Sequence, residues 1–232
     1  MKLGYQLGIT SKLLLVVTAI IVIAIGSVVY IASDLYLEES INRIQVNNKD
    51  SVFNSSIKIK NSMEDIASKM KLMAQVVNDG GYKSDQTQAT VHRILSGFDN
   101  FLSFYIYKRP KSDKVELYFS SVVDTSLSEY DLDKSQLEAL PLKEILEVTS
   151  GTTKEITLIN AAKHLKRPII SVVFVTTTKD QQEWLFRADI RQTTLSSALP
   201  EYEEITSYVV GKNGEVFAHS NESEAYKIYQ GL

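Results

Sequence analysis

The sequence contains no cysteine and only three histidines in 232 residues. Without cysteine, the chain has no disulfides, no thiol catalysis and no zinc site of the cysteine type. His92, His164 and His219 are far apart and follow none of the spacings of metal-binding or catalytic motifs. Lys and Arg form no cluster and the net charge is −3, which argues against nucleic-acid binding. We therefore predict no catalytic site, metal, cofactor or nucleic-acid partner for this chain.

Proline and glycine are absent between Ser33 and Asn78, so this stretch can form one uninterrupted helix that ends at Asp79-Gly80-Gly81. In its second half, apolar residues recur at alternating intervals of four and three residues, which places them in one line along the helix, here called the apolar seam. The seam consists of Ile59, Met63, Ile66, Met70, Met73 and Val77. Such a seam favours packing between helices. It packs either on the chain's own domain or in a parallel homodimer, and different stretches of the helix could do both.

Charge is absent from the run Leu13–Ile31, and a helix of this length spans a hydrocarbon core of about 30 Å. Lys2 and Lys12 precede the run and acidic residues follow it. Because positive charge stays in the cytoplasm, we expect a single span of the inner membrane with the N-terminus inside and the remaining chain outside. A cleaved signal peptide is the alternative, but its apolar part is usually only about 7–15 residues long. The lipid bilayer is therefore a predicted partner.

From residue 101 the apolar pattern changes to the two-residue period of β-strands. Five strands are predicted, with a helical insertion at 124–149 between the second and the third. The strands are Phe101–Tyr107, Lys114–Val123, Glu155–Ile159, Pro168–Thr177 and Glu183–Ile190. Antiparallel pairing of these strands, with helices on one side, gives an α+β fold.

A further hairpin is predicted at 207–218, because an Asn-Gly pair, Asn213-Gly214, is a strong turn signal between short strands. A two-stranded hairpin is marginally stable alone. We therefore expect it to open a second unit that is truncated here, and the chain to be an N-terminal fragment of a longer protein.

Two motifs in this part of the chain resemble the Cache sensor domains of bacterial receptors. The stretch Phe186–Ile190 followed by a helix at Thr193–Leu199 is similar to the exit of a first Cache unit. The stretch Tyr208–Ser220 is similar to the hairpin that opens the membrane-proximal unit. The resemblance implies a PAS-like, double-Cache sensor outside the membrane. In the family, such sensors precede the output domain of a chemoreceptor, a histidine kinase or a nucleotide cyclase.

The predicted organisation follows from these observations together. It comprises a cytoplasmic N-terminus (1–12), a transmembrane helix (13–31), a stalk helix (34–79), a PAS-like sensor domain (81–190), and a linker helix with the start of a proximal domain (191–232). The predicted function is that of the ligand-sensing part of a signal-transduction receptor. The alternatives are the regulatory head of a membrane adenylate or guanylate cyclase, a secreted binding protein, and a ligandless structural domain.

The candidate ligand site lies on the sheet. Tyr105 and Tyr107 share one face of their strand, because residues two apart do. Trp184 alternates with Phe186, whereas Arg187 and Asp189 share the other face of that strand. Arg187 and Asp189 could clamp a small zwitterion or pair with each other, and the aromatic residues could equally be core. The resemblance implies that Asp189 faces the ligand.

One departure from the family concerns Arg167. Amino-acid-sensing Cache domains carry an Arg-x-Trp-Tyr stretch on the middle strands. The matching region here reads Lys166-Arg167-Pro168-Ile169-Ile170, so Arg167 is a candidate ligand residue but the Trp-Tyr pair is missing. The resemblance therefore names a small-molecule ligand but not its chemistry.

Overall fold

Helix α1 (Ile9–Gly80) spans 72 residues without interruption. The computed structural model describes residues 8–81, 84–109, 115–141, 145–146, 156–177, 183–200, 206–211 and 214–221. Gly81 ends the helix with a left-handed φ of 77°, and its N–H donates to the carbonyl of Val77 at 3.0 Å. The predicted long helix is thus confirmed. The chain divides into two units, 1–54 and 55–232, which are described separately.

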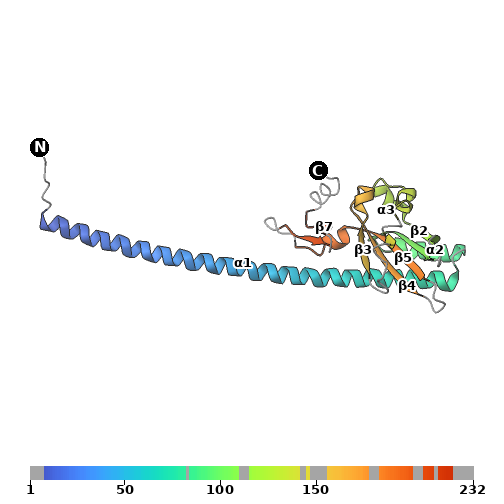
Figure 1. Cartoon of the computed structure of the whole chain (residues 1–232), viewed down its shortest axis with the longest axis horizontal. Helices are drawn as coiled ribbons and strands as arrows, with labels where there is room; N and C mark the ends of the chain where they lie inside the picture. The colour runs from blue at the N-terminus through green and yellow to red at the C-terminus, as the bar shows by residue number, and fades with distance from the viewer. Residues whose placement is uncertain are drawn as a thin grey trace. The chain divides into compact units, whose positions relative to one another are not determined.

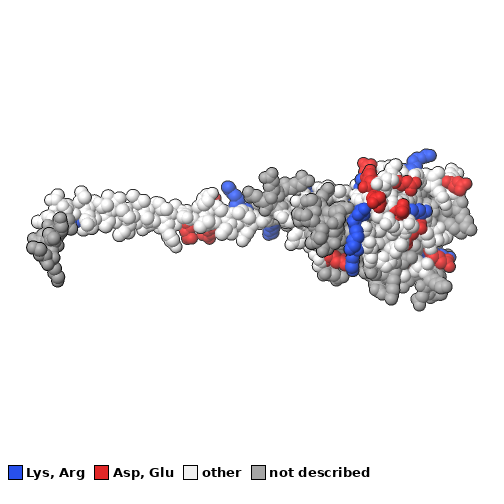
Figure 2. Space-filling view, turned by 90° about the horizontal axis from the view of Figure 1, so that it is seen from above, with Lys and Arg blue, Asp and Glu red and all other residues white. Residues whose placement is uncertain are grey.

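In the first unit, every side chain from Leu13 to Ile31 is exposed. The hydroxyls of Thr18 and Ser27 donate to carbonyls one turn earlier, each at 2.8 Å, so these polar groups are satisfied within the helix. Figure 2 shows the long uncharged stretch of this helix surface. Among the described residues, α1 is the one helix that is long and apolar enough to cross a membrane, judged by length and composition.

The second unit is built on a five-stranded antiparallel sheet with the strand order β2-β1-β5-β4-β3 (Figure 1). The strands are β1 (Phe101–Arg109), β2 (Glu116–Val122), β3 (Thr157–Asn160), β4 (Ile169–Thr177) and β5 (Glu183–Arg191). Strands β1 and β2 pair as a hairpin, as do β4 and β5, in agreement with the sequence prediction. Pairing of β1 with β5 places Tyr105 opposite Arg187 and Ser103 opposite Asp189. The α+β prediction is therefore confirmed.

One face of the sheet packs against the end of α1 and against α2 (Asp85–Ser96). Met70, Met73 and Val77 of α1 are at most 2% exposed and pack with strand residues such as Phe104. Full burial of each such side chain contributes about 1.5–3 kcal/mol to folding. This stretch of the apolar seam therefore packs on the chain's own domain, which is one of the two predicted alternatives.

The other face is also covered, so the prediction of helices on only one side of the sheet was wrong. The helices on this face are α3 (Asp124–Glu129), α4 (Lys134–Glu138) and α6 (Ala162–Leu165). Figure 1 shows α3 on the side of the sheet opposite the end of α1. The reason is that the strands direct large side chains toward both faces, and each face must be shielded from water. We call residues 124–140, which include α3 and α4, the cover.

Beyond the main sheet, β6 (Tyr208–Val210) and β7 (Val216–His219) form a separate two-stranded sheet. Phe217 is buried with the core on the α1 side. The side chain of Asn160, at the end of β3, donates from Nδ2 to the carbonyl of Val216 at 3.0 Å. The hairpin is thus confirmed, whereas its membership of a second, truncated unit stays a prediction.

The short helix predicted after β5 is present as α7 (Thr193–Ser196). Other predicted features lie outside the described residues. They are the N-terminal residues 1–7, the tip of the first hairpin at 110–114, most of the helix at 142–148, the turn at 178–182, and Asn213 of the Asn-Gly turn.

Candidate ligand-binding site

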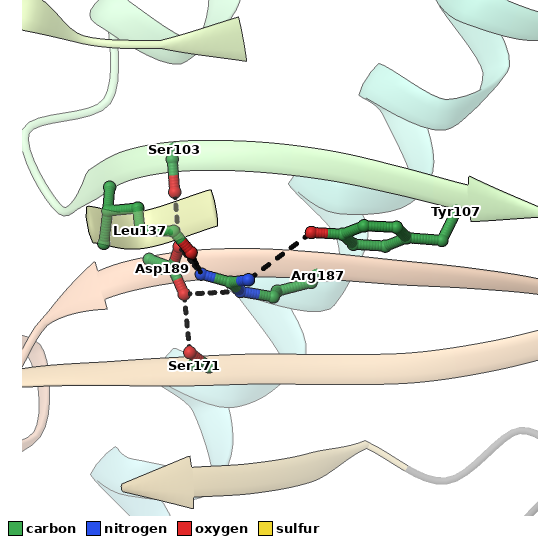
Figure 3. Close-up of polar contacts among 6 residues, drawn as sticks. All are labelled: Ser103, Tyr107, Leu137, Ser171, Arg187 and Asp189. Carbon is green, nitrogen blue, oxygen red and sulfur yellow. Dashed lines mark hydrogen bonds and ion pairs between the residues drawn. The ribbon is translucent and has the colours of Figure 1, made fainter. Parts of the chain in front are cut away.

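The face beneath the cover holds an ion pair at its centre. Arg187 and Asp189 lie two residues apart on β5, so both side chains point to this face, and both have 0% exposure. The guanidinium binds the carboxylate through Nε to Oδ1 at 3.0 Å and through Nη2 to Oδ2 at 2.7 Å (Figure 3). This two-bond geometry is the strongest arrangement of arginine on a carboxylate.

Two serines complete the coordination of the carboxylate. Ser103 on β1 and Ser171 on β4 are the register partners of Asp189 on its two neighbouring strands. The hydroxyl of Ser103 donates to Oδ2 at 2.6 Å, and that of Ser171 donates to Oδ1 at 2.5 Å. Each carboxylate oxygen therefore accepts two hydrogen bonds, which fills its usual acceptor capacity.

The remaining donors of Arg187 reach the cover and a tyrosine. Nη2 donates to the backbone carbonyl of Leu137 in α4 at 2.7 Å. Nη1 makes only a long contact of 3.4 Å with the hydroxyl of Tyr107. The guanidinium carbon lies 4.7 Å from the centre of the Tyr105 ring, which in turn stacks with Tyr107 at 6.1 Å. The arginine thus links the sheet, two aromatic rings and the cover.

Burial fixes the protonation of these groups. It raises the pKa of Tyr107 to about 12, although the nearby charge of Arg187 acts in the opposite direction. Burial, together with the charge of Asp189, raises the pKa of Tyr105 as well. For Arg187, burial alone would lower the pKa, but the charge and hydrogen bonds of Asp189 outweigh it and hold the pKa above its ordinary value. At neutral pH the site therefore contains two neutral phenols and a charged guanidinium.

The hydroxyl of Tyr105 is fully buried and makes no hydrogen bond of ordinary geometry among the described residues, although an interaction with Ser103 acts to lower its pKa against the larger effect of burial. Buried polar groups are nearly always paired, and an unpaired one costs about 1–3 kcal/mol. The hydroxyl lies in the same cluster as the charged pair, since the guanidinium carbon lies over the Tyr105 ring and Nη1 contacts the hydroxyl of Tyr107. It is therefore a donor that is available to an added molecule.

Two further arginines fasten the other end of the cover to the sheet. Arg191, the last residue of β5, donates to Glu129 Oε2 at 2.6 Å and to the hydroxyl of Ser126 at 3.2 Å. Arg167, just before β4, donates from Nε to the carbonyl of Tyr130 at 2.6 Å. The α3 end of the cover thus has several polar attachments, whereas α4 is joined to the sheet by the bond from Arg187 Nη2 to the Leu137 carbonyl.

A recess beside this cluster has room for about one water molecule. Its lining comprises Leu140, Pro141, Ile145, Ile159, Ala161, His164 and Ser171. Ser171 therefore connects the recess with the Asp189 carboxylate. A second, open depression of about 500 Å³ lies between α2 and β2 and includes Asp85, His92 and Lys134, but none of the predicted ligand residues. No group of His, Asp and Glu in the described part of the chain could hold a metal ion.

Four of the six predicted site residues come together, and two do not. Tyr105, Tyr107, Arg187 and Asp189 form the cluster beneath the cover. Trp184 lies on the opposite face, where its ring meets that of Tyr118 edge-on at 4.6 Å. Arg167 contacts the cover rather than the charged pair.

Sequence reasoning missed three members of the cluster, Ser103, Ser171 and the Leu137 carbonyl. A signal for the serines was present, because Ser171 is the one polar residue between Ile169 and Val175. Ser103 is likewise the one small polar residue in its aromatic strand. A lone hydroxyl in a buried strand indicates a polar partner in the core. The Leu137 carbonyl is a backbone group, and no sequence pattern marks it.

The comparisons with known proteins give similar solved structures only. No protein-family model matches the chain, and no curated protein matches it. The ligand-binding domain of the Pseudomonas fluorescens chemoreceptor CtaA, in complex with L-serine, is 12% identical with a TM-score of 0.45, covering 78% of this chain and 75% of that one. The extracellular domain of the putative histidine kinase soHK1S-Z6 is 11% identical with a TM-score of 0.42, covering 75% and 71%.

The ligand-binding domain of the Pseudomonas aeruginosa amino acid chemoreceptor PctC, in complex with GABA, is 14% identical with a TM-score of 0.38, covering 77% of this chain and 83% of that one. These similar structures are the ligand-binding domains of two chemoreceptors and the extracellular domain of a putative histidine kinase. At these identities and scores they assign neither a ligand nor a binding residue. The function is therefore argued from the residues of this chain.

Proposed function

We propose that this chain is the ligand-sensing part of a membrane receptor, and that a small molecule binds between the sheet and the cover, next to Arg187 and Asp189. One observation carries the proposal: a fully buried, bidentate ion pair lies beneath the short helices of the cover, within the apolar cluster on that face of the sheet. Buried ion pairs are weak contributors to stability, because desolvation offsets much of their attraction. Charged groups placed in such a position are typical of recognition sites.

The proposed mechanism is a shift between two arrangements of the cover. In one arrangement α4 lies on the ion pair, and in the other it has moved away. A ligand that binds the second arrangement more tightly shifts the equilibrium toward it, by at most the difference between its binding free energies for the two arrangements. The opposite face of the same sheet packs on α1, which continues without a break to the apolar run at 13–31. A change in the sheet is therefore proposed to reach the membrane as a small shift or rotation of α1.

Membrane placement and dimerisation belong to the same proposal. The apolar run Leu13–Ile31 crosses the inner membrane, with Lys2 and Lys12 in the cytoplasm and the sensor outside. The exposed apolar residues of α1 before the sensor, such as Ile41 and Ile44, pair with those of a second copy. No observation favours the alternative of a cyclase's regulatory head.

Ligand binding is tested with the full chain in nanodiscs, by measuring the thermal unfolding midpoint against organic acids, amines, amino acids and nucleosides. A ligand at 100 times its Kd adds about 2.7 kcal/mol to the free energy of unfolding, which is readily measured. At least one compound is expected to raise the midpoint. A cooperative unfolding transition that no compound moves would contradict small-molecule sensing by this chain.

Orientation is tested with single cysteines, because the native chain has none and labelling has no background. Asn47→Cys and Ser11→Cys place a thiol at exposed positions after and before the apolar run. A membrane-impermeant maleimide is expected to label Asn47→Cys in intact cells, but Ser11→Cys only after the membrane is permeabilised. The reverse pattern would overturn the orientation, and a mature N-terminus near Ser33 would support the secreted alternative.

A further inference from the structure

The cluster beneath the cover has filled acceptors and spare donors. Asp189 already accepts four hydrogen bonds, from Arg187 and from two serines. Of the five N–H groups of Arg187, three make short bonds, through Nε and Nη2. Nη1 has only the 3.4 Å contact with Tyr107, and the Tyr105 hydroxyl makes no hydrogen bond of ordinary geometry among the described residues. The Asp189 carboxylate therefore has no acceptor left, whereas Nη1 and the two tyrosine hydroxyls, which can donate as well as accept, have unused capacity.

Building on the proposed function, we propose that the ligand is a small organic carboxylate held by Arg187, Tyr105 and Tyr107, and not an amine or a zwitterion held by Asp189. A carboxylate is acceptor-only and has the planar shape that a guanidinium matches. The hydroxyl of Tyr107 accepts the weak contact from Arg187, so this contact does not use the hydroxyl's own proton. The surrounding Leu127, Leu132 and Leu137 favour a small apolar body on the ligand.

The protonation of the cluster supports an anion. Both phenols stay protonated far above neutral pH because burial raises their pKa values, so they act as donors. An ammonium group, in contrast, would find the Asp189 charge already balanced by Arg187 and its oxygens filled. It would also lie close to the like charge of Arg187, and like charges repel strongly where water is excluded.

The carbonyl of Leu137 is the internal acceptor that the ligand replaces. It binds Arg187 Nη2 at 2.7 Å and so occupies a donor that a carboxylate would bind more strongly. Replacing it frees α4 from its polar attachment, while Arg191 and Arg167 continue to hold the α3 end of the cover. Carboxylate binding is therefore coupled to displacement of α4, which provides the two arrangements that sensing requires.

The test uses four probes of matched size on the full chain in nanodiscs: propionate, propylamine, β-alanine and propanol. At about 10 mM, ten times a weak Kd of about 1 mM, propionate is expected to raise the unfolding midpoint by about 3–6 °C. Propylamine, β-alanine and propanol are expected to leave it unchanged. Tyr105→Phe and Tyr107→Phe remove only a hydroxyl each, and each is expected to reduce the propionate shift to less than half. Tyr36→Phe, on an exposed part of α1, is the matched control and retains the full shift.

The outcomes separate this inference from the proposed function. A shift with propylamine or β-alanine but not with propionate overturns the carboxylate and leaves small-molecule sensing in place. A propionate shift that persists in both tyrosine variants shows that the acid binds elsewhere and overturns the site. No shift with any probe, nor with any compound of the wider panel, contradicts the carboxylate and the sensing function together.

Discussion

The two faces of the central sheet are built in different ways. On the α1 side, buried residues such as Met70, Met73 and Phe104 form an apolar core against two helices of 72 and 12 residues. On the cover side, the helices have only four to six residues, and they enclose Arg187 and Asp189 at 0% exposure. Both faces thus bury apolar side chains, but the cover side also encloses a charged, hydrogen-bonded network.

This difference separates stability from recognition. Apolar burial is non-directional and holds α1 to the sheet without specific bonds. The polar network depends on a few short bonds, and one of them, from Arg187 to Leu137, joins the sheet to α4. Segments with little buried apolar area open at lower free energy than core helices. The cover is therefore expected to open more readily than the α1 side, and the proposed response to a ligand depends on this difference.

The largest effect is expected from breaking the ion pair. Asp189→Ala leaves the Arg187 charge buried and unpaired, and should lower the free energy of unfolding by about 3–5 kcal/mol. Urea denaturation measures this. The double variant Arg187→Met with Asp189→Ala removes the orphan charge and should be clearly more stable than Asp189→Ala alone. Equal stability of the two variants would show that the pair is not electrostatically coupled.

The apolar face should respond to loss of volume instead. Met73→Ala, at a fully buried position, should lower the free energy of unfolding by about 2–5 kcal/mol through the cavity that it leaves. Leu72→Ala, at the neighbouring position that is 48% exposed, is the control and should change it by less than about 0.5 kcal/mol. If both variants cost the same, the face of α1 that packs on the sheet has been misassigned.

Alkaline pH should weaken the cover side selectively. The pKa of Tyr107 is raised to about 12, so the folded protein keeps a proton that the unfolded chain releases above its ordinary pKa of 10.0. The contribution of Tyr107 is therefore complete below pH 10 and is lost as the pH rises to 12, about 3 kcal/mol in total. Urea titrations between these pH values measure the loss. Tyr107→Phe should show a smaller loss, and an identical pH profile would refute the assignment.

The smallest expected effect is an increase, not a decrease, in the free energy of unfolding. Tyr105→Phe removes a buried hydroxyl that makes no hydrogen bond of ordinary geometry among the described residues, so the free energy of unfolding should rise by about 1 kcal/mol. The same substitution is expected to weaken carboxylate binding, so stability and function would change in opposite directions. A clear loss of stability in this variant would mean that the hydroxyl is paired in the folded protein.

The sequence predicted the helices and strands better than the site. The two-residue alternation and the glycine stop at Gly81 are local signals, and they located α1 and the five strands. The pairing of β1 with β5 is a long-range contact, and it alone brings Ser103 beside Asp189. Trp184 was predicted as a site residue from its residue type, but its position on β5 directs it to the other face. The helical insertion at 124–149 was predicted, but its position over the second face of the sheet was not, because its short helices have no strong apolar period that would show which surface they cover.

The most direct test of the account is hydrogen–deuterium exchange on the full chain in nanodiscs, comparing the amides of α4 with those of α1 near Met73. The account predicts that the α4 amides exchange through local opening, at a free energy below that of global unfolding, whereas the α1 amides exchange only through global unfolding. Because the proposed carboxylate replaces the Leu137 carbonyl and frees α4, propionate is expected to speed exchange in α4 and to leave α1 near Met73 at its global rate. Equal protection of the two segments, unchanged by propionate, would contradict a responsive cover on a stable sheet.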